Sequence, residues 1–464
     1  MIVEISLVIS FLFLFCFFVW IRKTILSPSV IIAACFFLES FVWLLIANQY
    51  SIRLHWSVYF VLVFGVFFIF LGEEIGRNFD IFAHQKLSLQ KIHDKGARRE
   101  IENKHNGKYY YEPNNSDKRV PFNSKTMLVI LFFLCLTTAL YLYEDYHILI
   151  TYNGGSFPSF STAYGMLRAA MNSGSSVSFL LARMTEISFV LVIYCLYLLI
   201  TNLFSKRIKL IDLLPTICVC LFVFIGFLTS GRTYLERTVI AILVIALYIL
   251  FSKYAFWEAV KRSFFMAFIC LIVFGLGFSV AGLMRSSGGS TMGKQLYSFG
   301  FYVASSIPAF DLYLLNPVYN QTQFWGAHVF YGFYSFLSNF TTAFDEIMYM
   351  PLEMVNIGQG MATNIYTAFR RYYQDFGAFG VIFFPTLMGS FYGVFLEQWK
   401  RSKHQLLYLT IFSFEAFPLF EYGVEERFFT GVISGPGIFA IFLFILAYWV
   451  FISKGFLIKN ESNS

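Results

Sequence analysis

Charged residues are scarce in this sequence. Asp, Glu, Lys and Arg make up 13% of its 464 residues, whereas 58% are hydrophobic and 21% are aromatic. A soluble domain carries about 25% charged residues, so this composition excludes an ordinary soluble protein. Apolar runs of the length that crosses the hydrocarbon core of a bilayer recur from end to end. The runs are continuous rather than alternating, which predicts a helical membrane protein and not an outer-membrane barrel.

Cysteine is absent from the long polar segments. All seven cysteines lie in apolar runs, so we expect neither a disulfide framework nor a metal site of the zinc type. The D-x-D pair that would hold a metal-bound nucleotide sugar is also missing, and the one acid-x-acid spacing, Glu100 to Glu102, lies in a polar linker. We therefore expect no metal and no cofactor.

The first run lacks a basic n-region and a small-residue cleavage site, which predicts a mature span rather than a signal peptide.

Hydropathy predicts about eleven spans. They are placed at 2–21, 29–48, 57–76, 126–143, 183–204, 210–229, 234–252, 263–283, 376–397, 405–422 and 434–452. Alternate connections, such as 205–209, 252–262 and 399–404, are basic, and the positive-inside rule places them in the cytoplasm. The same rule applies to 77–125, which holds eleven Lys or Arg and six Asp or Glu. Its composition predicts a flexible linker that anchors the topology or, as the alternative, binds acidic lipids.

Two long connections are predicted to face outward, one at 144–182 and one from Arg285 to Tyr373. The second has about 90 residues, far more than an ordinary connection. It is rich in aromatic residues and poor in charge, which argues against disorder. We expect it to fold as a small helical cap at the outer leaflet, and we expect one amphipathic helix within 144–182.

Four arginines are predicted at the outer membrane level, at the ends of different spans. They are Arg232, Arg285, Arg370 and Arg371. Topology does not favour positive charge there. Each arginine alone could be an interfacial cation that meets lipid headgroups. Together, beside tyrosines, they favour a site for a lipid-linked phosphate or pyrophosphate, because guanidinium groups are planar, permanently charged donors.

Several titratable residues are candidates for roles in such a site. Asp375 follows Arg371 by four residues on one helix face, so we expect it to orient an arginine. His328, Asp311 and Glu425 are candidates for the general base, although a packed histidine and a solvated acidic turn are the alternatives. Three tyrosines near the arginines suit either the membrane interface or the face of a sugar ring. They are Tyr366, Tyr372 and Tyr373.

Three motifs resemble the bacterial O-antigen polymerases, the Wzy-type oligosaccharide repeat-unit polymerases. They are "TSGRTYL" at 229–235, "MRSS" at 284–287 and "NIYTAFRRYYQDFGAFGVIFFPTLMGSFYG" at 364–393. The resemblance covers roughly 225–400. It implies an inner-membrane glycosyltransferase of the GT-C class that uses undecaprenyl-pyrophosphate-linked repeat units. The growing glycan would pass to the non-reducing end of a new lipid-linked unit, with inversion and without metal.

The resemblance also implies site residues and partners. Arg232, Arg285 and Arg370 would contact pyrophosphate, and a chain-length-regulating co-polymerase would be a partner beside the membrane lipids; no nucleic acid is expected. The family supplies no base. An O-antigen ligase or another lipid-carrier glycosyltransferase is the main alternative, and a flippase or transporter, which would carry repeated halves and charges at mid-membrane, is a weaker one.

Together these expectations define an all-α polytopic protein with a large helical periplasmic loop. Its parts are N-terminal transmembrane helices at 1–76, a cytoplasmic linker at 77–125, central transmembrane helices at 126–283 with a periplasmic loop at 144–182, a large periplasmic loop at 284–375, and C-terminal transmembrane helices at 376–464.

Overall fold

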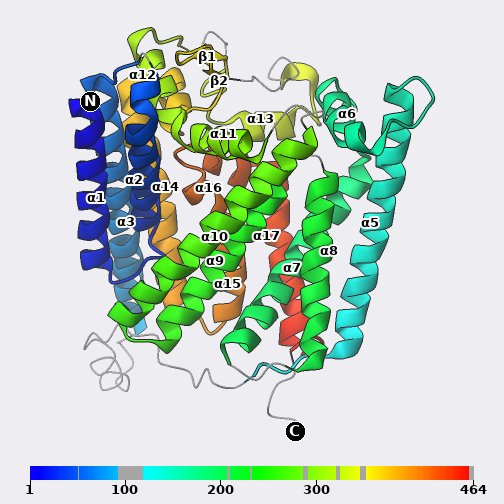
Figure 1. Ribbon diagram of the computed structural model, residues 1–464. Coiled ribbons are helices and arrows are strands. Elements are labelled where there is room, and N and C mark those ends of the chain that lie inside the picture. Colours follow the sequence, from blue (N-terminus) through cyan, green and yellow to red (C-terminus); the bar gives the residue numbers. More distant parts are fainter. Residues whose placement is uncertain are drawn as a thin grey trace.

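The molecule is a bundle of long helices (Figure 1). This computed structural model describes residues 1–50, 52–91, 119–205, 209–229, 233–285, 291–319, 324–344 and 352–458. Ten helical segments in these ranges are long and apolar enough to cross a membrane. They contain α1 (Ile2–Arg22), α2 (Pro28–Ile46), α3 (Trp56–Lys91), α5 (Ser124–Tyr152), α7 (Phe179–Phe204), α8 (Leu213–Leu228), α9 (Thr233–Lys253), α10 (Phe256–Arg285), α14 (Phe369–Arg401) and α17 (Gly435–Ala447). The prediction of a helical, multi-pass membrane protein is confirmed.

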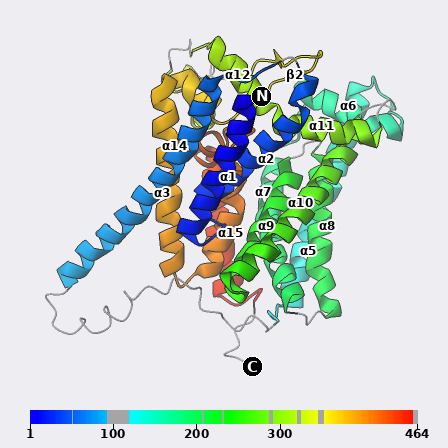
Figure 2. The same ribbon diagram turned by 60° about the vertical axis from the view of Figure 1, so that its left-hand side comes forward.

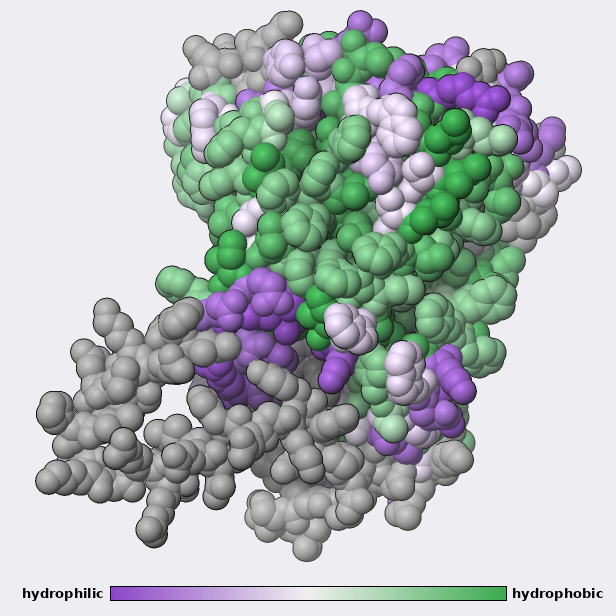
Figure 3. Space-filling model, turned by 90° about the vertical axis from the view of Figure 1, so that its left-hand side faces the viewer, coloured by the Kyte–Doolittle hydropathy of each residue, from purple (hydrophilic) through white to green (hydrophobic). Residues whose placement is uncertain are grey.

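A band of apolar side chains surrounds the bundle. Figure 3 shows it as a broad green zone between hydrophilic regions on the face formed by the N-terminal helices. Trp20 on α1 is 72% exposed and Phe268 on α10 is 60% exposed. Burial of apolar surface is worth roughly 25 cal/mol per Å², so a band of this kind is stable only when lipid covers it.

Basic residues gather at one end of the bundle, which we call the basic end. There the buried carboxylate of Glu73 lies 3.4 Å from Arg22 and 2.5 Å from Arg77. Glu397 lies 3.7 Å from Arg77 and 2.7 Å from Lys400. These ion pairs join α1, α3 and α14 where the sequence predicts the cytoplasmic side.

Short elements cover the opposite end, which we call the cap end. They are α11 (Met292–Ala304), α12 (Ser306–Leu315), α13 (Tyr331–Leu337), the 3-10 turn η3 (Thr342–Phe344) and a hairpin of β1 (Val355–Asn356) and β2 (Ala362–Thr363). Figure 1 shows α11 and α13 lying across the helix ends, with α6 (Phe160–Asn172) beside α5. α11 and α12 meet at a bend of 45°, and together they are long and apolar enough to count as one broken span.

The predicted span 405–422 is wrong as a continuous helix. It consists of α15 (Gln405–Glu415) and α16 (Phe417–Phe420), because Pro418 has no amide hydrogen and starts a new helix rather than continuing the old one. A turn and the π-helical η4 (Phe428–Val432) follow. His404, just before α15, contacts Tyr448 at the basic end, whereas Thr430 lies against Gly332 of α13 at the cap end.

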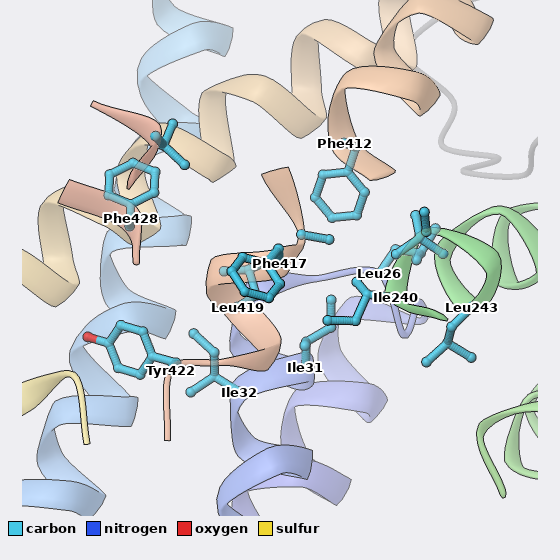
Figure 4. Packing of buried hydrophobic residues seen from close by; sticks show 14 of the residues in the cluster. Leu26, Ile31, Ile32, Ile240, Leu243, Phe412, Phe417, Leu419, Tyr422 and Phe428 are labelled. Atoms are coloured by element: carbon cyan, nitrogen blue, oxygen red, sulfur yellow. The ribbon is translucent and has the colours of Figure 1, made fainter. Parts of the chain in front are cut away.

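The chain therefore passes from one end of the bundle to the other between α14 and α17 as a broken helix, which we call the broken segment (405–434). It runs through the interior of the bundle. In Figure 4, Phe417 and Leu419 lie near Ile31 of α2 and Ile240 of α9, and all four side chains are buried. Non-helical backbone at this depth is tolerated only where protein surrounds it.

The polar segment after α3 begins as helix. α3 continues to Lys91 and projects from the bundle at the basic end (Figure 2). The prediction of a flexible linker from Arg77 onward is therefore wrong for its first part, because good helix formers extend α3 there. Residues 92–118 of the predicted linker lie outside the described residues, and α5 begins at Ser124, inside the predicted linker. Two 3-10 turns, η1 (Ala47–Gln49) and η2 (Leu210–Asp212), complete the fold together with the π-helical η5 (Tyr448–Ser453), which continues α17.

The contact between α3 and α14 is very close. It is formed by Gly72, Gly76, Gly389 and Gly393, which lie in two small-xxx-small patterns, "GEEIG" and "GSFYG". A Cβ atom at Gly72 would lie 2.1 Å from the carbonyl oxygen of Thr386. One at Gly389 would lie 2.2 Å from the carbonyl oxygen of Ile69. Glycine thus lets the two backbones touch, and this contact fixes where the first turns of α14 lie.

Candidate functional site

The first turns of α14 form a separate unit. Gly377 has φ 59° and ψ −148°, a conformation that glycine adopts without steric cost, and it separates Phe369–Phe376 from the rest of the helix. Arg370 and Arg371 are adjacent on this short unit, so their side chains leave the helix about 100° apart. The structure accordingly gives the two arginines different partners.

Arg370 is held inside the protein. Its side chain is 1% exposed, and Nη2 donates to both carboxylate oxygens of Glu353 at 2.7 and 2.9 Å. Nη1 donates to Gln374. The guanidinium also lies 3.4 Å from the ring centre of Tyr313 and 5.4 Å from that of Tyr366. Most donors of Arg370 are thus engaged by the protein itself.

Glu353 is the anionic partner of this arginine. Burial acts to raise the pKa of its carboxyl group, but the hydrogen bond and positive charge of Arg370, with a smaller contribution from His328, hold the pKa below its usual range. Half of the side chain is exposed. Glu353 is therefore ionised at neutral pH and lies between Arg370 and solvent.

Arg371 belongs to a second set of charges. Its Nη2 lies 3.2 Å from Oε1 of Glu425, and Nη2 of Arg427 lies 2.6 Å from the other oxygen, Oε2. Glu425 and Arg427 come from the turn between α16 and η4, inside the broken segment. The break in the helix thus brings Glu425 and Arg427 to α14. The carboxylate of Glu425 bridges the guanidinium groups of Arg371 and Arg427.

A cavity of about 180 Å³ adjoins this bridge. It lies between α7, α9, α14 and α17 and is also lined by Tyr331 of α13. We call it the arginine cavity, because Arg237, Arg371 and Arg427 line it together with the acids Glu186 and Glu425. Glu186 is already paired with Arg183 at 2.7 Å. The remaining charge of the lining is positive.

Arg237 of α9 is the exceptional member. Its guanidinium lies over the rings of Phe417 and Phe414, 4.8 and 5.4 Å from their centres. Its Nε is buried without a hydrogen-bond partner, and within the described ranges no carboxylate lies within ion-pair distance of it. Arg237 is half-buried, and holding a charge partly away from water without an ion pair costs free energy. The arrangement suits an anionic ligand, and a phosphate group matches the geometry of guanidinium donors.

Asp375 has a partner that the sequence analysis did not predict. Its Oδ1 lies 2.8 Å from Nδ1 of His328, and its Oδ2 accepts the backbone N–H groups of His328 and Val329 at 2.9 and 2.8 Å. The prediction that Asp375 orients an arginine is therefore wrong: it orients an imidazole. Arg371, one helical turn earlier, donates a hydrogen bond to Glu425 instead.

The other base candidates are bound by neighbours. Asp311 is fully buried on α12 and accepts two hydrogen bonds from His55, one from the backbone N–H at 3.2 Å and one involving Nδ1 at 2.9 Å. It does not line the arginine cavity. Glu425 does line it, but its two oxygens face Arg371 and Arg427.

The three predicted tyrosines differ in exposure. Tyr366 is buried, and its hydroxyl donates to the backbone of Glu353 at 3.1 Å. Tyr372 is fully buried among aromatic rings, so the idea that it borders a sugar path is wrong. Tyr373 remains partly exposed, and its ring stacks on Tyr319 with centres 6.2 Å apart.

Two predicted arginines cannot be compared with this site. Arg232 lies outside the described residues, and Arg285 is the last residue of α10, with its side chain outside the described part. Sequence reasoning also missed two residues. Arg237 could have been found as a charge within an apolar run. Nothing in the sequence marks Glu353 as a functional residue, because acidic residues are common in long connections.

Comparisons of this chain with family models, with curated proteins and with solved structures find no match.

Proposed function

We propose that this protein is a glycosyltransferase that polymerises undecaprenyl-pyrophosphate-linked O-antigen repeat units. In this proposal the cap end faces the periplasm, the basic end faces the cytoplasm of a bacterial inner membrane, and the fold is of the GT-C class. The motif resemblance at 229–235, 284–287 and 364–393 is one support. A chain-length-regulating co-polymerase is the proposed protein partner.

The observation that carries the proposal is the arginine cavity with Arg237, which has no ion pair among the described residues. Transfer of a glycan from a lipid diphosphate breaks the bond between the anomeric carbon and a phosphate oxygen, and negative charge develops on the leaving diphosphate. Cations fixed in place before the reaction stabilise that charge. Arg237, Arg371 and Arg427 would do so here, with Glu425 holding the last two in position.

This proposal changes the role of Arg370. Glu353 and Gln374 already occupy its terminal nitrogens, and Arg370 does not line the cavity. We assign it to holding the β1–β2 hairpin region onto α14. Of the two adjacent arginines for which the sequence predicts a pyrophosphate role, we keep that role for Arg371 alone.

His328 is the best supported base among the three candidates. Asp311 is committed to His55, and Glu425 to two arginines, whereas Nε2 of His328 accepts no hydrogen bond from the part of the chain that the structure describes. The acceptor sugar hydroxyl would give its proton to this nitrogen. Tyr373 and Tyr319, which form an exposed aromatic pair, would border the glycan.

The test is the lipopolysaccharide ladder on a gel from a deletion strain. The strain carries the intact protein, Arg237→Ala, Arg371→Ala or the control Arg168→Ala, which changes an arginine of α6 outside the cavity lining. We expect a full ladder from the intact protein and the control, and core plus one repeat unit from the two cavity variants at normal membrane levels. Loss of even the single-unit band on deletion would favour a ligase or flippase. Full ladders from both cavity variants would contradict the assigned site.

A further inference from the structure

Asp375 makes three contacts to a two-residue stretch of the cap. We infer that Asp375 is a positioning residue, which holds His328 in the tautomer whose Nε2 faces the acceptor hydroxyl and stabilises the imidazolium formed when that nitrogen takes the proton. This inference rests on the proposed function and adds the residue that makes the base competent.

The tautomer follows from the hydrogen bonds. Asp375 is fully buried, and its Oδ2 already accepts two backbone N–H groups. Carboxylate oxygens are acceptors, and two backbone donors already occupy Oδ2. The 2.8 Å contact from Nδ1 of His328 to Oδ1 is therefore an Nδ1–H donor. In the neutral imidazole the lone pair then lies on Nε2.

The two backbone hydrogen bonds fix more than the protonation state. They bind the peptide groups of His328 and Val329 to α14, so the backbone that carries the ring is held in place, while the contact from Nδ1 to Oδ1 orients the ring. His328 is 7% exposed and Val329 is fully buried. A second His–Asp pair, His55 with Asp311, has similar bonds, but there the histidine side chain is 52% exposed. The His328 ring is the more rigidly held of the two.

Neither Asp375 nor His328 lines the arginine cavity, but both are close in sequence to residues that do. Asp375 lies one helical turn after Arg371, and His328 lies three residues before Tyr331; Arg371 and Tyr331 both line the cavity. The charged groups that face the imidazole are Asp375 from α14 and Glu353 from the segment before β1, the latter already paired with Arg370. The carboxylate of Asp375 thus lies opposite the positive charge that proton transfer would place on the imidazole.

The step balances as follows. The acceptor hydroxyl oxygen forms a bond to the anomeric carbon of the growing glycan, and the bond from that carbon to the phosphate oxygen breaks. The electron pair leaves with the lipid diphosphate, whose charge the arginines stabilise. The hydroxyl proton passes to Nε2 of His328, and Asp375 stays ionised beside Nδ1–H. Water then removes the proton from Nε2 before the next transfer.

The experiment uses the full chain in lipid nanodiscs and lipid-linked repeat units extracted from the deletion strain. The elongation rate is measured between about pH 5 and pH 9 for the intact protein, Asp375→Asn, Asp375→Glu, His328→Ala and the control His404→Gln. His404 contacts Tyr448 at the basic end, so its variant should keep the rate of the intact protein. Melting temperatures show whether each variant is folded.

We expect Asp375→Asn to lower the rate by at least about 100-fold, because the amide favours the wrong tautomer. As the pH falls, the residual elongation rate of this variant should decline at a lower pH than the rate of the intact protein, because the imidazolium has lost its counter-charge. Asp375→Glu should recover part of the rate, and added imidazole should restore part of the rate of His328→Ala. A merely structural role would not produce the displaced pH profile or the imidazole rescue.

Three results would decide against the inference. If the intact protein elongates but Asp375→Asn keeps its rate and pH profile, the positioning role is wrong while the proposed function stands. If His328→Ala is folded but imidazole restores nothing, the base is another group. If the intact protein fails to elongate the extracted units, the proposed function fails, and this inference fails with it.

Discussion

At the scale of single residues, Arg237 is held at a cost. Its charge lies on two phenylalanine rings next to Arg371 and Arg427, and cation–π contacts of this kind are worth about 0.5–2 kcal/mol. That is less than the several kcal/mol lost when a charge leaves water. Arg237 lowers the stability of the fold and lies in a cavity. Such a residue is expected at a site that is selected for binding rather than for stability.

Arg237→Met is therefore expected to raise stability and abolish function. Methionine keeps most of the volume and removes a charge that has no ion pair among the described residues, so we expect about 1–3 kcal/mol of added stability and a higher melting temperature in detergent. The ladder should be lost. Arg183→Met is the matched control: it breaks the ion pair with Glu186 at 2.7 Å and should not stabilise the protein. A lower melting temperature for Arg237→Met would mean that Arg237 has a partner in the folded protein.

The pair of Glu353 and Arg370 should make stability depend on pH. The pKa of Glu353 lies below its usual 4.5, so its contribution is complete above about pH 4.5 and is lost as the pH falls through the lower pKa of the folded state. Glu353→Gln should lower the melting temperature at pH 7, because it leaves Arg370 buried without a counter-charge. The gap between variant and intact protein should narrow in acid. A gap that is constant from neutral pH into acid would show that the charge of Glu353 is not what stabilises the fold.

At the scale of helices, the contact of α3 with α14 depends on glycine. Gly389→Ala would place a methyl group 2.2 Å from a backbone oxygen of α3, which cannot move aside as a side chain can. We expect a loss of about 1–3 kcal/mol, seen as a lower melting temperature. Gly300→Ala is the control: it also lies within a helix, α11, but has nothing within 4 Å. It should be neutral or slightly stabilising, by up to about 1 kcal/mol. Equal changes in the melting temperature of both variants would mean that helix propensity, and not the close contact, determines the effect of Gly389→Ala.

Hydropathy located the long helices because each one is a continuous apolar run, and length and composition suffice for that. It failed at 405–422, where the run is just as apolar but Pro418 and the acidic turn after it break the helix. It also failed at the start of α14. "RRYY" reads as one charged and aromatic face, whereas helix geometry sends Arg370 to Glu353 and Arg371 to Glu425. Partners that distant in the chain depend on packing, which no local pattern in this sequence encodes.

At the scale of the whole molecule, the orientation can be tested with reporter fusions. Alkaline phosphatase joined after Gly155 should be active outside the cytoplasm, and green fluorescent protein joined after Ser402 should fluoresce inside. A phosphatase fusion after Ser434 should also be active, because the broken segment carries the chain from the basic end to the cap end. The fusion after Ser434 could be inactive while the fusions after Gly155 and Ser402 behave as expected. That result would mean that the broken segment returns to the basic end.

The arginine cavity also has a consequence for how the protein is made. Arg237 enters the membrane with α9, long before the ribosome has produced the turn that holds Glu425 and Arg427. Until that turn arrives, the acids that can lie near Arg237 include Glu186 on the earlier α7 but not Glu415 or Glu425, which come later in the chain. A chain that stops before the broken segment would leave this arginine facing lipid. Such fragments should be targets for membrane proteases, and a split protein should survive only when its C-terminal part is supplied in the same cell.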